Sequence, residues 1–294
     1  MRWNKISIIG TGLLGGSLAL AIKQRQLAGT VHAFVRREAS VVECTKLEIA
    51  DLVTRDIRQA VDGADLIILC TPLGQLAERA GDLRPFLKPG AVVTDVGSVK
   101  GPVVRDLEPI IREGKGEFVG SHPMAGSERA GAAAARGDLF QSAVCLVTPT
   151  RQTSAAALAA VEGFWQSVGA WPIRISAEAH DDLVSRSSHL PHVVAAELAN
   201  YILSPAHPKE QSLVCATGFR DTTRIASGSP EMWRDIALAN RANLCRVLGV
   251  FIEDLQEFQL ALEREDVQAI QEFFTNAKQR RDAWRPYSPA SSPE

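Results

Sequence analysis

A glycine-rich turn near the N-terminus constrains the fold of this chain more than any other feature of its sequence. The apolar run 6–9 ends in the pattern Gly-x-Gly-x-x-Gly, and a helical pattern follows at once. A dinucleotide pyrophosphate requires this order, because the glycines allow a tight turn, a close approach of backbone to phosphate, and close packing of the helix, whose N-terminus faces the anion. A purely structural glycine turn is the alternative. The predicted phosphate-binding residues are Gly10, Gly12, Leu13, Leu14 and Gly15.

The first half of the chain alternates short apolar runs with amphipathic stretches. Strand candidates lie at 5–9, 30–35, 65–70, 91–95, 116–120, 143–148 and 170–175, and helical stretches between them include 14–27, 39–48, 74–86 and 101–113. This alternation predicts an α/β fold over residues 1–176, a Rossmann-type, doubly wound parallel sheet covered by helices. Ligands of such sheets bind beyond the carboxyl ends of the strands. We therefore expect Thr71, Pro72 and Ser98 to share one crevice with the loop after residue 120.

The second half has a different hydrophobic pattern, with almost none of the alternation typical of strands. An apolar stripe recurs in steps of four and three and comprises Leu244, Leu248, Phe251, Leu255, Phe258 and Leu262. The stripe predicts one long helix over 231–263, about 50 Å in length. So long a stripe favours a homodimer, although the helix could instead cover its own domain. We predict an all-helical dimerisation domain at 177–285 and a disordered Pro- and Ser-rich tail at 286–294.

Composition excludes several classes of partner and location. The net charge of −2 gives no electrostatic reason to bind nucleic acid or an anionic membrane. The apolar runs are too short to cross a bilayer, and the N-terminus does not resemble a signal peptide. The five cysteines are scattered and have apolar neighbours, which predicts buried free thiols and a cytoplasmic location.

Two polar motifs follow strand candidates. His122 comes after 116–120, where it would face the nicotinamide end of a bound dinucleotide. A neutral imidazole suits removal of a hydroxyl proton as hydride leaves, because its pKa lies near the working pH. A loop histidine that caps a backbone group is the alternative. Ser98 follows 91–95, and its hydroxyl either caps the next helix or orients an imidazole or a substrate hydroxyl.

Three histidines, His180, His189 and His192, fall on the first helix expected in the second half. Their spacing does not align on one helical face, so we predict no metal site. Pro191 should kink this helix and free backbone carbonyls, which favours a polar pocket at the kink. For His180, a structural role in the core stays open.

Two arginines follow Gly218 four residues apart. Arg220 can pair locally with Asp221. Arg224 lies beside the apolar Ile225, and a partly buried arginine there needs an anionic partner. A substrate carboxylate suits its planar guanidinium, whereas an interdomain ion pair is the alternative.

These motifs, in this order, closely resemble those of the prephenate/arogenate dehydrogenase family of tyrosine biosynthesis. The resemblance covers residues 4–284. The matching motifs are Gly10-x-Gly12-x-x-Gly15-Gly16, Asp95-x-Gly97-Ser98-Val99-Lys100, His122-Pro123-Met124-Ala125-Gly126-Ser127-Glu128, Ser188-His189-Leu190-Pro191-His192 and Gly218-Phe219-Arg220-Asp221-x-x-Arg224-Ile225-Ala226.

The resemblance implies a reaction and a role for each matching residue. Hydride passes from C4 of a cyclohexadienol to the nicotinamide, and the ring carboxylate leaves as carbon dioxide. By the family pattern, His122 contacts the substrate 4-hydroxyl and Ser98 assists it. Arg224 holds the ring carboxylate, and His192 lines the substrate pocket.

The choice of substrate and coenzyme follows from other positions. Glu128 and Trp233 match family members that favour prephenate over arogenate, so the expected product is 4-hydroxyphenylpyruvate; an arogenate dehydrogenase that forms tyrosine directly is the alternative. The acid that binds the ribose of NAD is replaced by Val35, and Arg36 and Arg37 follow it. Arginines there suit a 2′-phosphate, so we favour NADP over NAD, although they could also form a solvated turn.

Two other classes of protein share this plan. A β-hydroxyacid or imine reductase would be favoured by a catalytic lysine on the interdomain helix, and residues 178–204 contain none. A dinucleotide-sensing protein without turnover needs no proton acceptor, so the presence of His122, Ser98 and Arg224 disfavours it.

Overall fold

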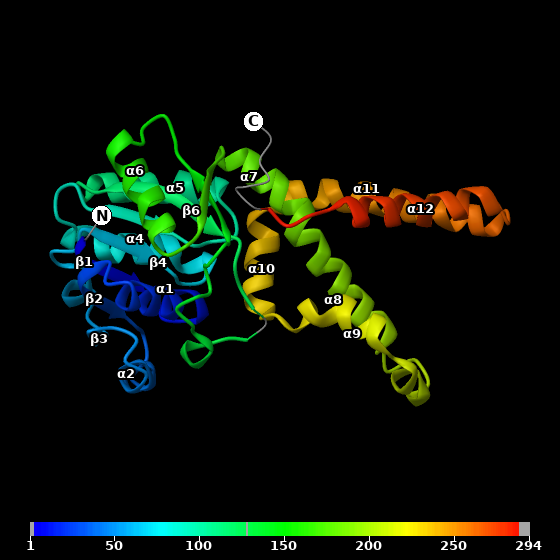
Figure 1. The fold of residues 1–294 in the computed structure, drawn as a ribbon, viewed down its shortest axis with the longest axis horizontal. Coiled ribbons are helices and arrows are strands. Elements are labelled where there is room, and N and C mark those ends of the chain that lie inside the picture. The colour runs from blue at the N-terminus through cyan, green and yellow to red at the C-terminus, as the bar shows by residue number, and fades with distance from the viewer. Residues whose placement is uncertain (1–2, 128, 288–294) are drawn as a thin grey trace.

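An eight-stranded sheet forms the first half of the chain, in the order β3-β2-β1-β4-β5-β6-β7-β8 (Figure 1). A computed structural model describes residues 3–127 and 129–287. The strands are β1 (Trp3–Ile9), β2 (Ala28–Phe34), β3 (Leu52–Thr54), β4 (Leu66–Leu69), β5 (Val92–Asp95), β6 (Glu117–Pro123), β7 (Val144–Thr148) and β8 (Trp171–Arg174). Strand order reverses beside β1, as in a doubly wound Rossmann sheet, which confirms the predicted fold class.

The sheet differs from the sequence prediction at two strands. The short β3 was missed, because three residues are too few to show a period of two. The strand at 116–120 continues through Pro123, and its last residues pair antiparallel with β7, His122 opposite Leu146. The expectation of an all-parallel sheet is therefore wrong at this pair. His122 lies in a strand, not in the loop where the motif predicted it.

Helices cover the sheet on both faces. They are α1 (Leu13–Gln24), α2 (Glu38–Lys46), α3 (Ile57–Val61), α4 (Leu76–Leu83), α5 (Gly101–Glu113) and α6 (Ala155–Ser167), with 3₁₀ turns η1 (Leu73–Gln75), η2 (Arg84–Phe86) and η3 (Ala132–Ala134). Ser154 caps α6 through Ala157 N–H, and Asp56 caps α3 through the N–H groups of Arg58 and Gln59.

Helices make up the described part of the second half, as predicted. They are α7 (Ala177–Val184), the π-helical η4 (Ser185–His189), α8 (Leu190–Ile202), η5 (Lys209–Val214), α9 (Thr217–Thr223), η6 (Arg224–Ser227), α10 (Pro230–Ala239), α11 (Arg241–Glu263) and α12 (Val267–Ala283). The α11–α12 hairpin and the α8–α9 segment project from the body as two arms (Figure 1).

The single helix predicted over 231–263 is in fact two helices. Asn240 separates α10 from α11, with φ −107° and ψ 27°. Its buried side-chain amide donates to the Asp181 carbonyl oxygen at 2.8 Å and to Nδ1 of His189 at 3.2 Å. Asparagine readily leaves helical geometry when its side chain can hydrogen-bond elsewhere. The apolar period of the sequence continues past Asn240 and therefore gave no sign of the break.

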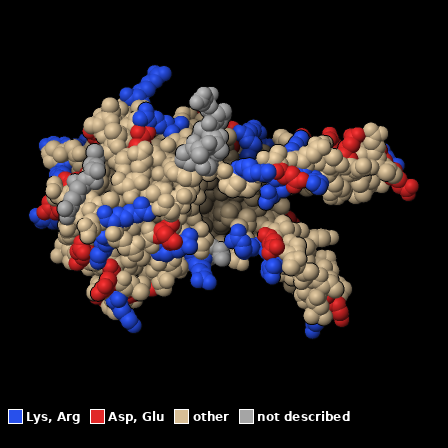
Figure 2. Space-filling view, in the orientation of Figure 1, with Lys and Arg blue, Asp and Glu red and all other residues tan. Residues whose placement is uncertain are grey.

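The apolar stripe of α11 is buried only at its start. Leu244 is buried, whereas Leu255 and Leu262 are 47% and 51% exposed. Near the tip, the ring of Phe258 contacts Phe273 of α12, with centroids 4.4 Å apart. The projecting arms carry large uncharged areas (Figure 2). This hairpin therefore leaves much of its apolar surface uncovered by the chain itself.

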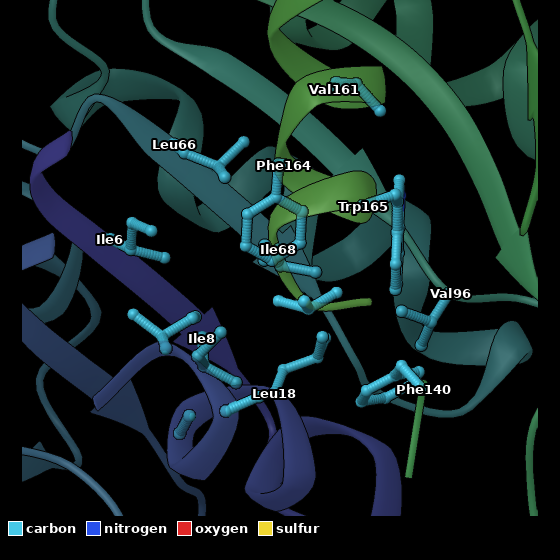
Figure 3. Packing of buried hydrophobic residues seen from close by; sticks show 14 of the residues in the cluster. Ile6, Ile8, Leu18, Leu66, Ile68, Val96, Phe140, Val161, Phe164 and Trp165 are labelled. Carbon is cyan, nitrogen blue, oxygen red and sulfur yellow. The ribbon is translucent and has the colours of Figure 1, made fainter. Parts of the chain in front are cut away.

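Two apolar clusters flank the sheet, and the alternation of strand side chains separates them. Leu66 and Ile68 of β4 point into one cluster, and Ile67 and Leu69 point into the other. The first cluster packs Ile6, Ile8 and Leu18 with Phe140, Phe164 and Trp165 (Figure 3). This core supports strands β4 and β5, which Thr71 and Ser98 follow.

The remaining sequence predictions concern cysteines, membranes and the tail. All five thiols are free. Burial is confirmed at Cys44 and Cys145, whereas Cys70 and Cys215 are half-buried and the expectation is wrong at Cys245, which α11 exposes. Within the described part of the chain, no helix has both the length and the apolarity to cross a membrane. Most of the tail, 288–294, lies outside the described residues; Tyr287 packs edge-on against Trp171.

Candidate active site

The glycine turn between β1 and α1 has no room for side chains at two positions. Gly10 has φ +100°, and a Cβ atom there would lie 3.0 Å from the Cys70 carbonyl oxygen. A Cβ atom on Gly15 would lie only 1.9 Å from the carbonyl oxygen of Gly10. Glycine at these positions therefore permits the turn itself and the packing of α1 on the strand.

The same turn is open where a phosphate would bind. A Cβ atom on Gly12 would meet nothing within 4 Å. Gly12 caps α1 without a side-chain hydrogen bond, and the first turn, which starts with Leu13 and Leu14, contains no acidic residue. Beside it, the buried Thr71 Oγ1 has no partner, and the exposed Pro72 follows. Free N–H groups, open space and an unpartnered hydroxyl fit a dinucleotide pyrophosphate.

Arginines gather where β2 ends. Val35 is buried, and Arg36 and Arg37 after it are exposed. Arg55, which follows β3, donates from Nε to the Arg36 carbonyl oxygen at 3.2 Å, and its guanidinium lies 3.4 Å from Glu38. Arg55 was not predicted as a site residue, because the short strand β3 that brings it to this edge was not predicted either.

His122 lies buried at the edge of the sheet where the carboxyl ends of β4 and β5 also meet. Its Nδ1 is 2.9 Å from Nε2 of His180, and Nδ1 of His180 is 2.8 Å from Oδ1 of Asp181. Burial holds the pKa of His122 well below 6.5, with further lowering by His180, Lys100 and His189. The ring is therefore neutral at physiological pH and able to accept a proton.

A buried ion pair braces the strand ends around this histidine. Lys100 Nζ pairs with the Asp95 carboxylate and donates to the Ser121 carbonyl oxygen at 3.0 Å, and both charged side chains are completely buried. Burial lowers the pKa of Lys100, and Asp95 opposes that shift. The Ser121 hydroxyl donates to the Asp95 carbonyl oxygen at 2.7 Å, so the end of β5 is tied to the residue before His122.

Ser98 is half-buried, just beyond β5 on the same edge of the sheet. Among the described residues, no hydrogen bond joins its hydroxyl to His122, nor does that hydroxyl cap α5. Burial lowers the pKa of His189 to about 4, whereas the backbone of Ser98 acts in the opposite direction and raises it. The predicted role of the Ser98 hydroxyl stays a prediction.

Two predicted substrate residues, His192 and Trp233, stack on each other. The rings of His192 and Trp233 have centroids 3.7 Å apart and an interplanar angle of 29°. Nδ1 of His192 donates to the Ser188 carbonyl oxygen at 2.9 Å, which leaves its Nε2 as an acceptor. The indole leaves no room at Gly228, where a Cβ atom would lie 2.8 Å from Nε1 of Trp233.

Arg224 begins η6, which packs against α8. Burial is the main cause that lowers the pKa of His192, and the positive charge of Arg224 lowers it further. The expectation that Arg224 is partly buried is wrong, because it is exposed in the single chain, at a helix end. The local pair of Arg220 with Asp221 is confirmed, with Nε and Oδ1 3.2 Å apart. Glu128, the predicted selector of prephenate, lies outside the described residues.

Pro191 interrupts the helix that carries the three histidines. The π-helical η4 runs up to His189, and α8 then begins with proline in its first turn. Proline has no N–H to donate and therefore disturbs the helical ladder before it, as predicted. The described residues contain no group of three or more His, Cys, Asp or Glu side chains that could hold a metal ion.

Neither the contact of His122 with His180 nor that of His180 with Asp181 was predicted from the sequence. The sequence predicted no metal site and allowed a structural role for His180 in the core. A usable signal was present, since Asp181 directly follows His180, and a carboxylate beside a histidine often orients its ring. A separate groove of about 350 Å³ between η1, α5 and α10 contains none of the predicted site residues.

Models of two protein domains match the chain. Residues 18–173 match the nucleotide-binding domain of prephenate dehydrogenase, and residues 176–276 match its dimerization domain. Among curated relatives, the cyclohexadienyl dehydrogenase of Zymomonas mobilis is 36% identical over 94% of both chains. The prephenate dehydrogenase of Bacillus subtilis is 34% identical over 94% of this chain and 75% of its own length.

Solved structures give the same picture. The prephenate dehydrogenase of Aquifex aeolicus, in complex with hydroxyphenyl propionate and NAD⁺, has a TM-score of 0.89 at 32% identity, covering 96% of this chain and 98% of that chain. The arogenate dehydrogenase of Synechocystis has a TM-score of 0.79 at 27% identity, covering 95% and 99%.

Proposed function

The chain belongs to the prephenate dehydrogenase family, and we propose that it oxidises and decarboxylates prephenate with His122 as the proton acceptor. As a member of that family it is an NAD(P)-dependent oxidoreductase. The nicotinamide, when bound, accepts hydride from C4 of the substrate ring. Loss of the ring carboxylate as carbon dioxide then gives 4-hydroxyphenylpyruvate, and the formation of an aromatic ring drives the step.

One observation carries the proposal: a buried, neutral imidazole lies at the edge of the sheet where the carboxyl ends of β4 and β5 meet, the edge at which such sheets bind their ligands. The C4 hydroxyl must lose its proton as hydride leaves, because a carbonyl forms there. His122 takes that proton, so an O–H bond breaks as an N–H bond forms. The pKa of His122, held low by burial, keeps the ring ready for this step at neutral pH.

The helical half supplies the groups that hold the substrate. Arg224 binds the ring carboxylate, since a guanidinium matches a carboxylate in charge and shape. His192 and Trp233 form one wall of the pocket, and their stacking fixes both rings. Ser98 orients the substrate hydroxyl from the end of β5. Glu128, which lies outside the described residues, is proposed to favour prephenate because it matches family members with that preference.

We further propose NADP as the preferred coenzyme. Arg36, Arg37 and Arg55 gather at the end of β2, and Val35 offers no carboxylate to the ribose hydroxyls. Three guanidinium groups favour a 2′-phosphate, which carries negative charge at this position. The structure of the Aquifex aeolicus relative contains NAD⁺, so the alternative is that this chain uses NAD.

The working unit is proposed to be a homodimer formed through the helical arms. The match to a dimerization domain supports this, as do the exposed apolar residues of α11 and α12. Burying that surface against a second copy would release its water, as in other obligate dimers.

The deciding experiment measures reduced nicotinamide by absorbance with prephenate or arogenate and with NAD or NADP, in four combinations. The highest kcat/KM is expected for prephenate with NADP. A higher kcat/KM for arogenate would make the chain an arogenate dehydrogenase, and no turnover in any combination would reject the proposed function.

The role of His122 is tested by His122→Asn, which should lower kcat about 10²–10⁴-fold. Arg224→Ala should instead raise KM, by roughly 10-fold or more, because it removes binding and not the base. His32→Asn, on β2, is the control and should leave both constants unchanged. A near-normal kcat in His122→Asn would remove its role as the base.

A further inference from the structure

A row of three buried side chains links the sheet to the helical half. His122 comes from β6, and His180 and Asp181 come from α7. Two contacts join the three side chains: the ring nitrogens of His122 and His180 are 2.9 Å apart, and Nδ1 of His180 is 2.8 Å from the Asp181 carboxylate. All three side chains are buried, so each ring nitrogen that faces a neighbour in the row must donate a hydrogen bond to it or accept one from it.

The far end of the row is firmly anchored. The Asp181 carboxylate accepts from the backbone N–H of Lys100 at 2.7 Å and from that of Gly101 at 2.8 Å, where α5 begins. The Asp181 carbonyl oxygen accepts from the Asn240 amide. Three hydrogen bonds, two from the start of α5 and one from the junction of α10 and α11, therefore hold Asp181 in place, and its Oδ1 is aimed at His180.

These contacts fix the position of every proton along the row. A carboxylate only accepts, so Nδ1 of His180 carries the hydrogen and donates it to Asp181. Nε2 of a neutral His180 is then bare and accepts. Nδ1 of His122 must therefore donate to it, and Nε2 of a neutral His122 holds the free electron pair. The basic nitrogen of His122 is the one outside the row.

We propose that His180 and Asp181 are positioning residues, which hold His122 in the tautomer that can accept a proton and stabilise the charge it then carries. The inference rests on the proposed role of His122 as the base. When Nε2 of His122 gains the substrate proton, its Nδ1–H bond to His180 strengthens, because the donor is now cationic. Asp181, one ring further, provides the compensating negative charge. The proton stays on His122 until it is released, and no other reactant is needed.

The first test reads the tautomer directly in the full-length wild-type protein. Nitrogen-15 NMR of histidine-labelled protein distinguishes protonated from bare ring nitrogens, and the His122→Asn spectrum identifies the signals of His122. Near neutral pH, we expect hydrogen on Nδ1 of His122 and none on Nε2. Hydrogen on Nε2 with Nδ1 bare would overturn the proposal. No substrate is present, so the result is independent of whether prephenate is turned over.

The second test separates positioning from packing. His180→Leu removes the acceptor and should lower kcat about 10²-fold while KM stays within about twofold. His180→Gln places an amide oxygen where it can accept from His122, so it should recover at least about 10-fold of that loss. Val184→Ala, a buried change on the same helix, is the control for packing and should leave kcat unchanged. Equal kcat values in the Leu and Gln variants, or a change confined to KM, would refute the positioning role.

Discussion

The two halves of this molecule differ in where their apolar surface goes. In the first half, Ile6 and Ile67 of the sheet and Phe164 of α6 are completely buried by the chain itself. In the α11–α12 hairpin, Leu255 is 47% exposed and Phe274 59% exposed. The first half thus has its own core, whereas the second leaves a large apolar surface for another surface to cover.

This difference divides the proposed site. The glycine turn and His122 lie on strands and turns that the inner core supports. Arg224, His192 and Trp233 lie on the helices of the second half, which leaves more of its apolar surface exposed in the single chain. The sheet half should therefore keep its coenzyme site under changes that disrupt the arms, and substrate binding should be the more fragile property.

The largest effect is expected from Gly15→Ala, which introduces a steric clash in the turn between β1 and α1 of the sheet half. The added methyl group would lie 1.9 Å from the Gly10 carbonyl oxygen, so the backbone of the turn must move. We expect a loss of about 3–5 kcal/mol in the free energy of unfolding, measured with urea.

Gly12→Ala is the matched control for that substitution. Its methyl group meets nothing within 4 Å and its φ of −69° suits alanine, so stability should change by less than about 1 kcal/mol. The methyl group would instead enter the space proposed for the pyrophosphate and weaken coenzyme binding at least about 10-fold. Equal stability losses in the two variants would show that steric conflict at Gly15 is not the cause.

The second prediction tests the dependence of the helical half on a partner. Leu255→Asp places a charge on the exposed stripe of α11 and should raise the dimer dissociation constant about 10²-fold, measured by sedimentation equilibrium. Coenzyme binding should persist, and the KM for prephenate should rise.

The same substitution in the other half gives the control. Leu47 follows α2 and is 42% exposed, similar to Leu255. Leu47→Asp should leave the dimer intact, because this leucine lies outside the proposed interface. If Leu255→Asp also stays dimeric, the arm is not the contact surface.

Sequence patterns predicted the sheet half well because its signals are local. The glycine motif lies within six residues, and apolar runs of four to seven residues mark most strands. The break at Asn240 could not be predicted in this way, since it depends on hydrogen bonds to Asp181 and His189, which are distant in the sequence. A helical period reports which face is buried and does not register a single residue that leaves helical geometry.

The site divides along the same line. His122 and the glycine turn follow from motif and strand position. The partners of His122 could not be found in this way, because α7 reaches His122 only after β6 extends beyond 116–120 and the helix packs against the sheet. Contacts between elements, unlike motifs within one element, need the tertiary fold.

The third prediction concerns pH, and it targets the junction between the halves. Burial lowers the pKa of His189 from 6.5 to about 4, with Asp181 acting in the opposite direction. The unfolded chain therefore binds a proton on this residue at a higher pH than the folded chain. The contribution to stability is complete above pH 6.5 and is lost as the pH falls toward the folded value. His189 should account for a loss of about 2 kcal/mol at about pH 5.

Calorimetry between neutral pH and about pH 5 checks this expectation. The pKa values of His122 and His180 are also lowered by burial, so their contributions have the same sign. His189→Gln should flatten the pH dependence, whereas His207→Gln, beyond α8 on an arm, should not. An unchanged slope in His189→Gln would assign the acid sensitivity to other groups.

The smallest effect is expected at the coenzyme edge. Replacing Arg36 and Arg37 together by alanine should raise the KM for NADP roughly 10-fold and change the KM for NAD less than about twofold, because only the 2′-phosphate loses its partners. Both side chains are exposed and lie outside the proposed interface, so we expect the substitution to leave the fold and the dimer intact. Arg25→Ala, in the same sheet half at the end of α1, is the control. Equal effects on the two coenzymes would make the pair a solvated turn, and the sheet half would then bind dinucleotides through its glycine turn without selecting between them.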